Sequence, residues 1–221
     1  MEKKYELTAE CKEVGNHKLY RIRALKAIPR FGVKEGDLGG WIEHSGNLSQ
    51  DGDAWVSDDS CVCGNAQVFC SAKVYGDAWV SGNAVVYGHA RVHLHAMVFG
   101  DSCVYDCAEV SGNAKISGNA KIYGFAKIYG EAEVYGSPWI SGNAEVCCKT
   151  DYMVFKNTWS SGRHFTYTCS NKKWTVGCFH GTGEELIEKA YADSELSGQC
   201  YETIVKAVEQ IERAKAVFGK C

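Results

Sequence analysis

The sequence predicts a mainly β fold whose centre is a parallel β-helix, flanked by an N-terminal β-hairpin and a small C-terminal α+β domain. Three observations predict it. Sixteen consecutive six-residue units run from residue 52 to 147 without insertion or deletion. The fifth position is Val or Ile in all sixteen units, and Gly opens twelve of them. An uninterrupted repeat of this kind is typical of stacked, quasi-one-dimensional folds.

Each unit has the residue types that a short strand and a corner require. Side chains alternate between the two faces of a strand, so the third and fifth positions share one face. Ala occupies the third position in thirteen units, which places a small residue beside a β-branched one on the inner face. Gly followed by Asn or Asp tolerates the positive φ of a tight corner. Because the phase never reverses, we expect parallel strands rather than hairpins.

The recurring pattern V-x-G-[ND]-A-x resembles the left-handed β-helix of hexapeptide-repeat proteins. That resemblance implies three units, or 18 residues, per coil and therefore about five coils. The leader FGVKEGDLGGWIEHSGNLSQDGDAWV is similar to the entry segment of a YdcK-like family of bacterial and phage genomes. Together the resemblance covers residues 31 to 147.

The flanks divide the chain into three parts, with boundaries at 1–40, 41–147 and 148–221. Residues 4–28 are predicted to form a hairpin about a Gly15-Asn16 turn, followed by a connector. Trp41 is expected to start a first, imperfect coil. In the last part, the segments 151–156, 164–170 and 173–179 predict a three-stranded antiparallel sheet. A capping box from Thr182 to Glu185 predicts a helix over 183–193, and a second helix is expected over 199–218.

Composition excludes several classes of protein. The net charge of −3 argues against a nucleic-acid polymer as partner, and no apolar run is long enough to predict a membrane span. The first residues have no apolar segment of signal-peptide type, so we expect a cytoplasmic protein, in the host cytoplasm if phage-encoded. The twelve cysteines contain no CxxC pair and are interpreted as reduced thiols. We therefore expect no metal site and no cofactor.

An 18-residue coil arranges the outward side chains in columns, and one column is aromatic. A contiguous apolar stripe on a surface usually marks a contact. A terminal element, a second subunit or a ligand could cover it, and we expect a homo-oligomer, a dimer or a trimer. The residues predicted to form this interface are Phe69, Tyr87, Tyr105 and Tyr123, with Trp79 and Met97 on a second face.

A second cluster predicts a ligand site. Arginine and lysine bind phosphates, and aromatic faces stack on bases. Regional net charges of +3 for 1–40, −7 for 41–147 and +1 for 148–221 favour the ends of the chain for an anion. The candidate ligand-binding residues are Trp159, Arg163, His164, Tyr167, Lys172 and Trp174. An ordinary hairpin with core aromatics and solvated lysines would give the same pattern.

Three functions remain open at this point. The first is a non-catalytic, oligomeric binding protein that captures a small anionic ligand, such as a nucleotide signal; the phage-like resemblance extends this to sequestration in counter-defence. The second is a structural scaffold or filament. The third comes from the resemblance, because many hexapeptide-repeat proteins are acyltransferases with a histidine base; here His93 or His95, oriented by Asp77, would serve. No loop interrupts the repeat, which favours the non-catalytic alternative.

Overall fold

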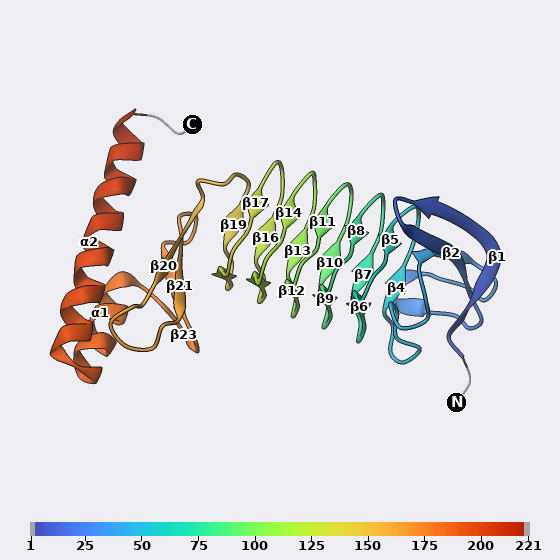
Figure 1. The fold of residues 1–221 in the computed structure, drawn as a ribbon, viewed down its shortest axis with the longest axis horizontal. Helices are drawn as coiled ribbons and strands as arrows, with labels where there is room; N and C mark the ends of the chain where they lie inside the picture. The colour runs from blue at the N-terminus through green and yellow to red at the C-terminus, as the bar shows by residue number, and fades with distance from the viewer. Residues whose placement is uncertain (1–2, 219–221) are drawn as a thin grey trace. The chain divides into compact units, whose positions relative to one another are not determined.

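The structure is a computed structural model that describes residues 3–218 (Figure 1). The chain divides into two compact units, Met1–Lys149 and Thr150–Cys221. The N-terminal unit contains a β-hairpin and a parallel β-solenoid, and the C-terminal unit contains an antiparallel sheet and two helices. Neither helix in the described part of the chain has the length and apolar character that crossing a membrane requires.

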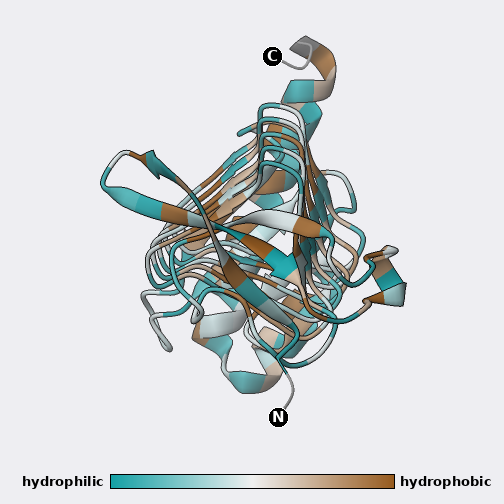
Figure 2. Cartoon of the chain, turned by 90° about the vertical axis from the view of Figure 1, so that its right-hand side faces the viewer, coloured by the Kyte–Doolittle hydropathy of each residue, from teal (hydrophilic) through white to brown (hydrophobic). Residues whose placement is uncertain are grey.

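The N-terminal hairpin is confirmed. Strands β1 (Tyr5–Val14) and β2 (His17–Ala24) pair antiparallel about a turn in which Gly15 has a φ of 59°. A short 3-10 helix, η1 (Pro29–Phe31), lies in the connector that follows β2. Strand β2 then pairs antiparallel with β3 (Leu38–Ile42), and β3 pairs parallel with β5, so the hairpin sheet continues into the solenoid. Figure 2 shows the hairpin lying across the end of the coils and extending beyond their outline.

The solenoid has sixteen two-residue strands, one for each six-residue unit, as the repeat predicts. They form three parallel sheets in which each strand pairs with strands 18 residues away, and with β3 they make about six turns. The strands are β4 (Trp55–Val56), β5 (Cys61–Val62), β6 (Gln67–Val68), β7 (Lys73–Val74), β8 (Trp79–Val80), β9 (Val85–Val86), β10 (Arg91–Val92), β11 (Met97–Val98), β12 (Cys103–Val104), β13 (Glu109–Val110), β14 (Lys115–Ile116), β15 (Lys121–Ile122), β16 (Lys127–Ile128), β17 (Glu133–Val134), β18 (Trp139–Ile140) and β19 (Glu145–Val146).

The inner face of the solenoid is the expected column of small and β-branched side chains. Ala78, Val80, Ala96 and Val98 are all fully buried, and the same holds for the matching positions of the other coils. Backbone hydrogen bonds join successive coils, as from the Trp79 amide to the Ala96 carbonyl at 2.9 Å. Burial of these side chains and pairing of these amides position every outward residue in a fixed column.

The corners require positive φ even where glycine is missing. Four units open with another residue, and all four adopt the left-handed conformation: Asp58, Cys70, Leu94 and Asp106, with φ between 55° and 59°. This conformation costs an L-residue roughly 1–2 kcal/mol. The aspartates recover part of that cost, because the Asp58 carboxylate accepts a hydrogen bond from the Gly76 amide at 2.9 Å.

The C-terminal unit has four strands instead of the three expected. Its sheet, in the order β20 (Tyr152–Lys156), β21 (His164–Thr168), β22 (Lys173–Val176) and β23 (Phe179–Gly181), is antiparallel throughout. The segment 173–179, predicted as one strand, divides because Gly177 has a φ of 58° and reverses the chain.

Both predicted helices are present in the C-terminal unit. Helix α1 (Gly183–Asp193) has the complete capping box, in which the Glu185 amide donates to the Thr182 hydroxyl and the Glu185 carboxylate accepts from the Thr182 amide. Helix α2 (Glu195–Phe218) begins four residues earlier than predicted. The core of this unit consists of buried side chains from the sheet and both helices: Phe165, Tyr167, Trp174, Leu186, Ala190, Tyr201, Val205 and Val208.

Candidate functional site

A groove of about 690 Å³ opens on one face of the solenoid, within the N-terminal unit. Pockets that bind small molecules have volumes of about 300–1,000 Å³, so its size suits such a ligand. Side chains from three stacked coils and from the connector line it. These residues are Arg30, Phe31, Ser71, Lys73, Tyr75, His89, Arg91, Cys107 and Glu109.

The sheet and the connector position the charged side chains of the groove. Strands β7, β10 and β13 are neighbours, and their register places Lys73, Arg91 and Glu109 in one outward column. Arg30 and Phe31 reach this column from η1. Residues around η1 are held by an antiparallel bridge between Ile28 and Val33, whose amides each donate to the other's carbonyl. The connector contacts the solenoid through the Arg30 guanidinium, which bonds to His89, and the Phe31 ring, which lies near Lys73.

One side of the groove follows the corners of the coils, and two of these corners lack glycine. Ser71, His89 and Cys107 line the groove directly after three stacked corners. Two of those corners are Cys70, with a φ of 59°, and Asp106, with a φ of 55°. Backbone strain of this kind tends to accumulate at functional sites.

Aromatic rings hold the cationic groups of the groove in place. The Lys73 ammonium lies 5.2 Å from the centre of the Phe31 ring and 4.9 Å from that of Tyr75. The Arg30 guanidinium lies 5.9 Å from the Phe31 ring, and its Nη2 donates a hydrogen bond to Nδ1 of His89 at 3.0 Å. Cation–π attraction and this hydrogen bond restrict the cationic side chains before any ligand arrives.

The cations of the groove lack acidic partners. Among residues 3–218, none of Arg30, Lys73 and Arg91 forms an ion pair with a carboxylate. Glu109 faces Arg91 across the strands, but its carboxylate is bound to Nε2 of His93 at 2.8 Å. The His93 ring is in turn stacked on Tyr75 at 4.6 Å. The groove therefore has a surplus of positive charge.

The Tyr75 hydroxyl remains a hydrogen-bond donor at neutral pH. Burial raises the pKa of Tyr75, the Glu109 charge raises it further, and the Arg91 charge opposes both. A phenol that keeps its proton can donate to an anion in the groove.

The six ligand-binding residues predicted in the C-terminal unit have different surroundings in the structure. Tyr167 and Trp174 are buried and pack together in its core, with ring centres 5.0 Å apart. Trp159 is half-buried with its ring edge-on to Tyr201. The other three candidates are exposed: Arg163, His164 and Lys172. Ligand binding by these six residues stays a prediction.

The histidines considered for acyl transfer have different partners. His95 Nδ1 lies 3.5 Å from the Asp77 carboxylate, and both side chains are largely exposed. His93 instead contacts two residues that line the groove, Tyr75 and Glu109. The two histidines therefore do not form one catalytic group with Asp77.

The aromatic column is a ladder of stacked rings. Phe69, Tyr87, Tyr105 and Tyr123 stack in sequence, with ring centres 4.9–5.1 Å apart. On the second face, Trp79 packs against a cluster of Leu19, Trp41, Cys61 and Cys63, so the hairpin covers part of that apolar face. Met97 stays 37% exposed. A subunit interface at these positions stays a prediction.

Sequence reasoning missed the groove, although one signal was available. Lys73 and Arg91 are exactly one coil apart, which places two cations side by side. The sequence did not show that Arg30 and Phe31 fold back against that column. It also missed a group of side chains that could hold a metal ion, His17, Glu43 and Cys63, whose potential ligand atoms all lie within 4.8 Å of one another.

No known protein family and no curated protein matches this chain. Its function must therefore be inferred from its own residues and their geometry.

Proposed function

We propose that the protein is a non-catalytic binding protein that captures a small anionic ligand in the groove between η1 and strands β7, β10 and β13. One observation carries this proposal: Arg30, Lys73 and Arg91 line a groove of ligand size without an acidic partner among the described residues. Unpaired cations held close together repel one another, and a bound anion removes that cost while forming charge-assisted hydrogen bonds.

The geometry favours recognition of phosphate or carboxylate groups over stacking of a base. Lys73 lies over the Tyr75 ring and His93 is stacked on that ring, while Lys73 and Arg30 both lie near Phe31. The rings therefore orient cations and offer little free surface to a base. A nucleotide or another phosphorylated metabolite would be held by its phosphates, with donors from Ser71 and Tyr75 at the wall.

Two further proposals accompany this function. The six-residue strand period supports membership of the left-handed hexapeptide-repeat proteins, and the leader sequence supports a relation to the YdcK-like family. The stacked aromatic ladder supports a homo-oligomer, because it is a row of partly exposed rings on one side of the solenoid. Light scattering coupled to gel filtration tests the second proposal, and a strictly monomeric protein would contradict it.

The binding function is tested by calorimetric titration of the purified chain with pyrophosphate, AMP and ADP. We expect at least one of these probes to bind, and Lys73→Ala and Arg91→Ala each to weaken it about tenfold or more, since a hydrogen bond to a charged group is worth about 1.5–3 kcal/mol. Lys127→Ala is the matched control, because Lys127 lies in the same column and is paired with Glu145.

The control variant is expected to bind like the wild-type protein. Absence of binding for all three probes, or an equal loss in Lys127→Ala, would overturn the proposal. His95→Ala separates binding from acyl transfer: we expect unchanged affinity, since His95 does not line the groove.

A further inference from the structure

Three side chains with metal-binding atoms meet where the hairpin joins the solenoid. His17 is the first residue of β2, Glu43 follows β3 and Cys63 follows β5. These three strands are consecutive in one sheet, so residues far apart in sequence become neighbours. Their ligand atoms, one per residue, all lie within 4.8 Å of one another. This group is separate from the groove, which none of its members lines.

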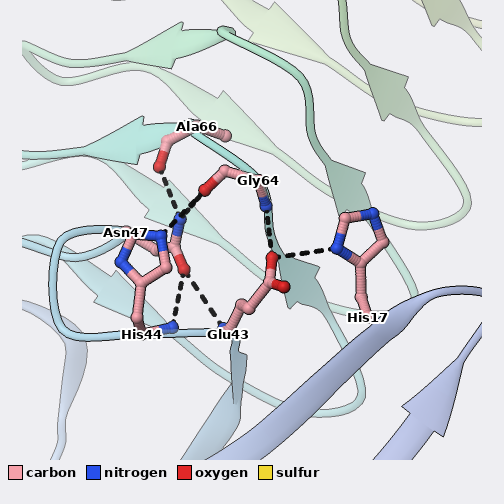
Figure 3. A network of polar contacts seen from close by, with 6 residues as sticks. All are labelled: His17, Glu43, His44, Asn47, Gly64 and Ala66. Carbon is pink, nitrogen blue, oxygen red and sulfur yellow. Dashed lines mark hydrogen bonds and ion pairs between the residues drawn. The ribbon is translucent and has the colours of Figure 1, made fainter.

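The scaffold around the group fixes the carboxylate of Glu43 (Figure 3). Its Oε2 accepts hydrogen bonds from the Gly64 amide at 2.7 Å and from Nδ1 of His17 at 2.9 Å. The buried Asn47 side chain fixes the adjoining backbone, because its Oδ1 accepts from the Glu43 amide and its Nδ2 donates to the Gly64 carbonyl. Bonds of this kind orient a ligand before the metal arrives.

Cys63 supplies a buried sulfur beside that carboxylate. Its side chain is fully buried, and within residues 3–218 its thiol forms no hydrogen bond. Burial, and then the charge of Glu43, raise the pKa of the Cys63 thiol to about 12. Without a cation the thiol keeps its proton, although it donates no hydrogen bond to the neighbouring Glu43 carboxylate.

We propose that His17, Glu43 and Cys63 form a binding site for a zinc ion. Imidazole nitrogen, carboxylate oxygen and thiolate sulfur are the three ligand types that Zn²⁺ takes in proteins, and a site with three protein ligands leaves a fourth position for water. His44 does not complete the set, because its Nε2 bonds to the Gly64 carbonyl and its ring lies on the other side of Glu43 from His17 (Figure 3).

The ion has a route into the site and a defined proton balance. The His17 side chain is 36% exposed and that of Glu43 is 28% exposed, so the outer side of the group opens to solvent. On binding, a Zn–S bond replaces the S–H bond of Cys63 and the thiol proton leaves to solvent. His17 coordinates as a neutral imidazole in the tautomer that carries its hydrogen on the other ring nitrogen, so a Zn–N bond replaces the hydrogen bond from Nδ1 to Glu43 if Nδ1 is the ligand atom. No electrons are transferred.

A metal at this position would cross-link the hairpin to the first coils of the solenoid. His17 belongs to the hairpin, whereas Glu43 and Cys63 directly follow β3 and β5, which pair with each other in parallel. The ion would therefore join three strands across the point where antiparallel pairing changes to parallel pairing. It would act on the stability of the N-terminal unit, and the anion groove would work with or without it.

The test uses Co²⁺ as a spectroscopic probe of the full chain, purified without metal under reducing conditions. We expect a thiolate-to-cobalt charge-transfer band that saturates at one equivalent and is displaced by Zn²⁺. Cys63→Ser should remove the band. His17→Ala should weaken metal binding by at least the roughly 10- to 100-fold that loss of an outer-shell partner costs.

Matched controls keep the test decisive. Cys11→Ser changes an exposed cysteine of the same hairpin and should keep the band. His17 lies at the surface, so His17→Ala provides a result even if Cys63→Ser fails to fold. Zn²⁺ should also raise the Tm of the wild-type chain and of Cys11→Ser. The increase in Tm should be much smaller for His17→Ala. No charge-transfer band in the wild-type chain, or an undiminished band in His17→Ala or in folded Cys63→Ser, would overturn the proposal.

Discussion

The two unequal halves of the solenoid, the ten units of residues 52–111 and the six units of residues 112–147, share one frame and differ at their corners. Residues 52–111 and 112–147 both place Ala and Val or Ile inward, and both join their coils by the same backbone hydrogen bonds. All four corners without glycine fall in the first half, whereas every corner of the second half is glycine. In the first half, four residues other than glycine therefore adopt the left-handed conformation, which costs free energy for a residue with a Cβ atom.

The halves also differ in how their charges are used. In the second half, Lys127 pairs with Glu145 at 3.9 Å. In the first half, Lys73 and Arg91 lie without such partners beside the groove, and Glu109 is bound to His93 instead. Two of the four corners without glycine, Cys70 and Asp106, directly precede residues that line the groove. The comparison indicates that a functional site should be sought where residues depart from the repeat pattern.

The largest expected effect tests the frame that both halves share. Gly82 and Gly112 have φ values near 67°, and an added Cβ would lie 2.8–2.9 Å from the amide nitrogen of the next coil. Gly82→Ala and Gly112→Ala should each destabilise the protein by about 2–4 kcal/mol, from left-handed strain plus overpacking. Denaturant unfolding measures the change.

Gly136 provides the matched control, because it has a φ of 82° but nothing within 4 Å of an added Cβ. Gly136→Ala should cost only the roughly 1–2 kcal/mol of the left-handed conformation. A much larger loss in one half than in the other would show that the two halves do not share one frame.

The aromatic ladder crosses from the first half to the second. Tyr105 is stacked between Tyr87 and Tyr123, with ring centres 4.9 and 5.0 Å away. Tyr105→Ala removes both stacking contacts, each worth about 0.5–1.5 kcal/mol beyond burial, and should destabilise the chain by about 2–3 kcal/mol. Tyr135→Ala, at a 63% exposed position of the second half, should cost less in the same unfolding experiment. Equal losses would contradict a stabilising ladder.

One cation of the N-terminal unit is satisfied by backbone carbonyls. The buried Lys4 ammonium donates to the carbonyl of Ala54 at 2.8 Å and of Gly52 at 3.3 Å, at the start of the first regular coil. Burial lowers the pKa of Lys4 to about 8, with a smaller contribution from Lys26. Between this value and the ordinary lysine pKa, the unfolded chain binds more protons than the folded chain.

The contribution of Lys4 to stability should therefore rise between about pH 8 and pH 10, with a slope of at most about 1.4 kcal/mol per pH unit. The difference in unfolding free energy between the wild-type protein and Lys4→Met isolates this contribution from the other titrating groups. A difference that is flat or falls with pH over this range would contradict the buried, partly neutral lysine.

The smallest expected effect is a gain in stability in the first half. Leu94 has a φ of 59° and is 51% exposed, so its side chain gives little burial in return for its strain. Leu94→Gly should raise the unfolding free energy by about 0.5–1 kcal/mol, because the relief of strain exceeds the entropy cost of glycine. Leu94→Ala keeps the strained Cβ and should not stabilise. If alanine stabilised as much as glycine, the strain would not be the cause.

The frame was predictable because each of its residues acts locally. The position of Val80 or Ala96 within its six-residue unit is enough to predict that its side chain is buried. In the same way, Thr182 and Glu185, three residues apart, are enough to predict the start of α1. The fourth strand of the C-terminal sheet was missed because Gly177 is compatible with a strand and with a turn, and only pairing with β22 decides between them.

The sites were harder to predict because their residues meet only through the fold. Arg30 reaches Lys73 through the path of the connector, which no periodic pattern describes. His17 and Cys63 become neighbours because β2, β3 and β5 share one sheet. The repeat fixes which residues of the solenoid are stacked, but not which flanking residues fold against them.

The most direct test of the central claim is the anomalous diffraction of a crystal of the protein soaked in selenate, a tetrahedral dianion. An anion-binding groove predicts an anomalous peak among Arg30, Lys73 and Arg91, stronger than any at the paired lysine Lys127. A groove without a peak, in a crystal that leaves it open to solvent, would contradict the claim that these cations exist to hold an anion.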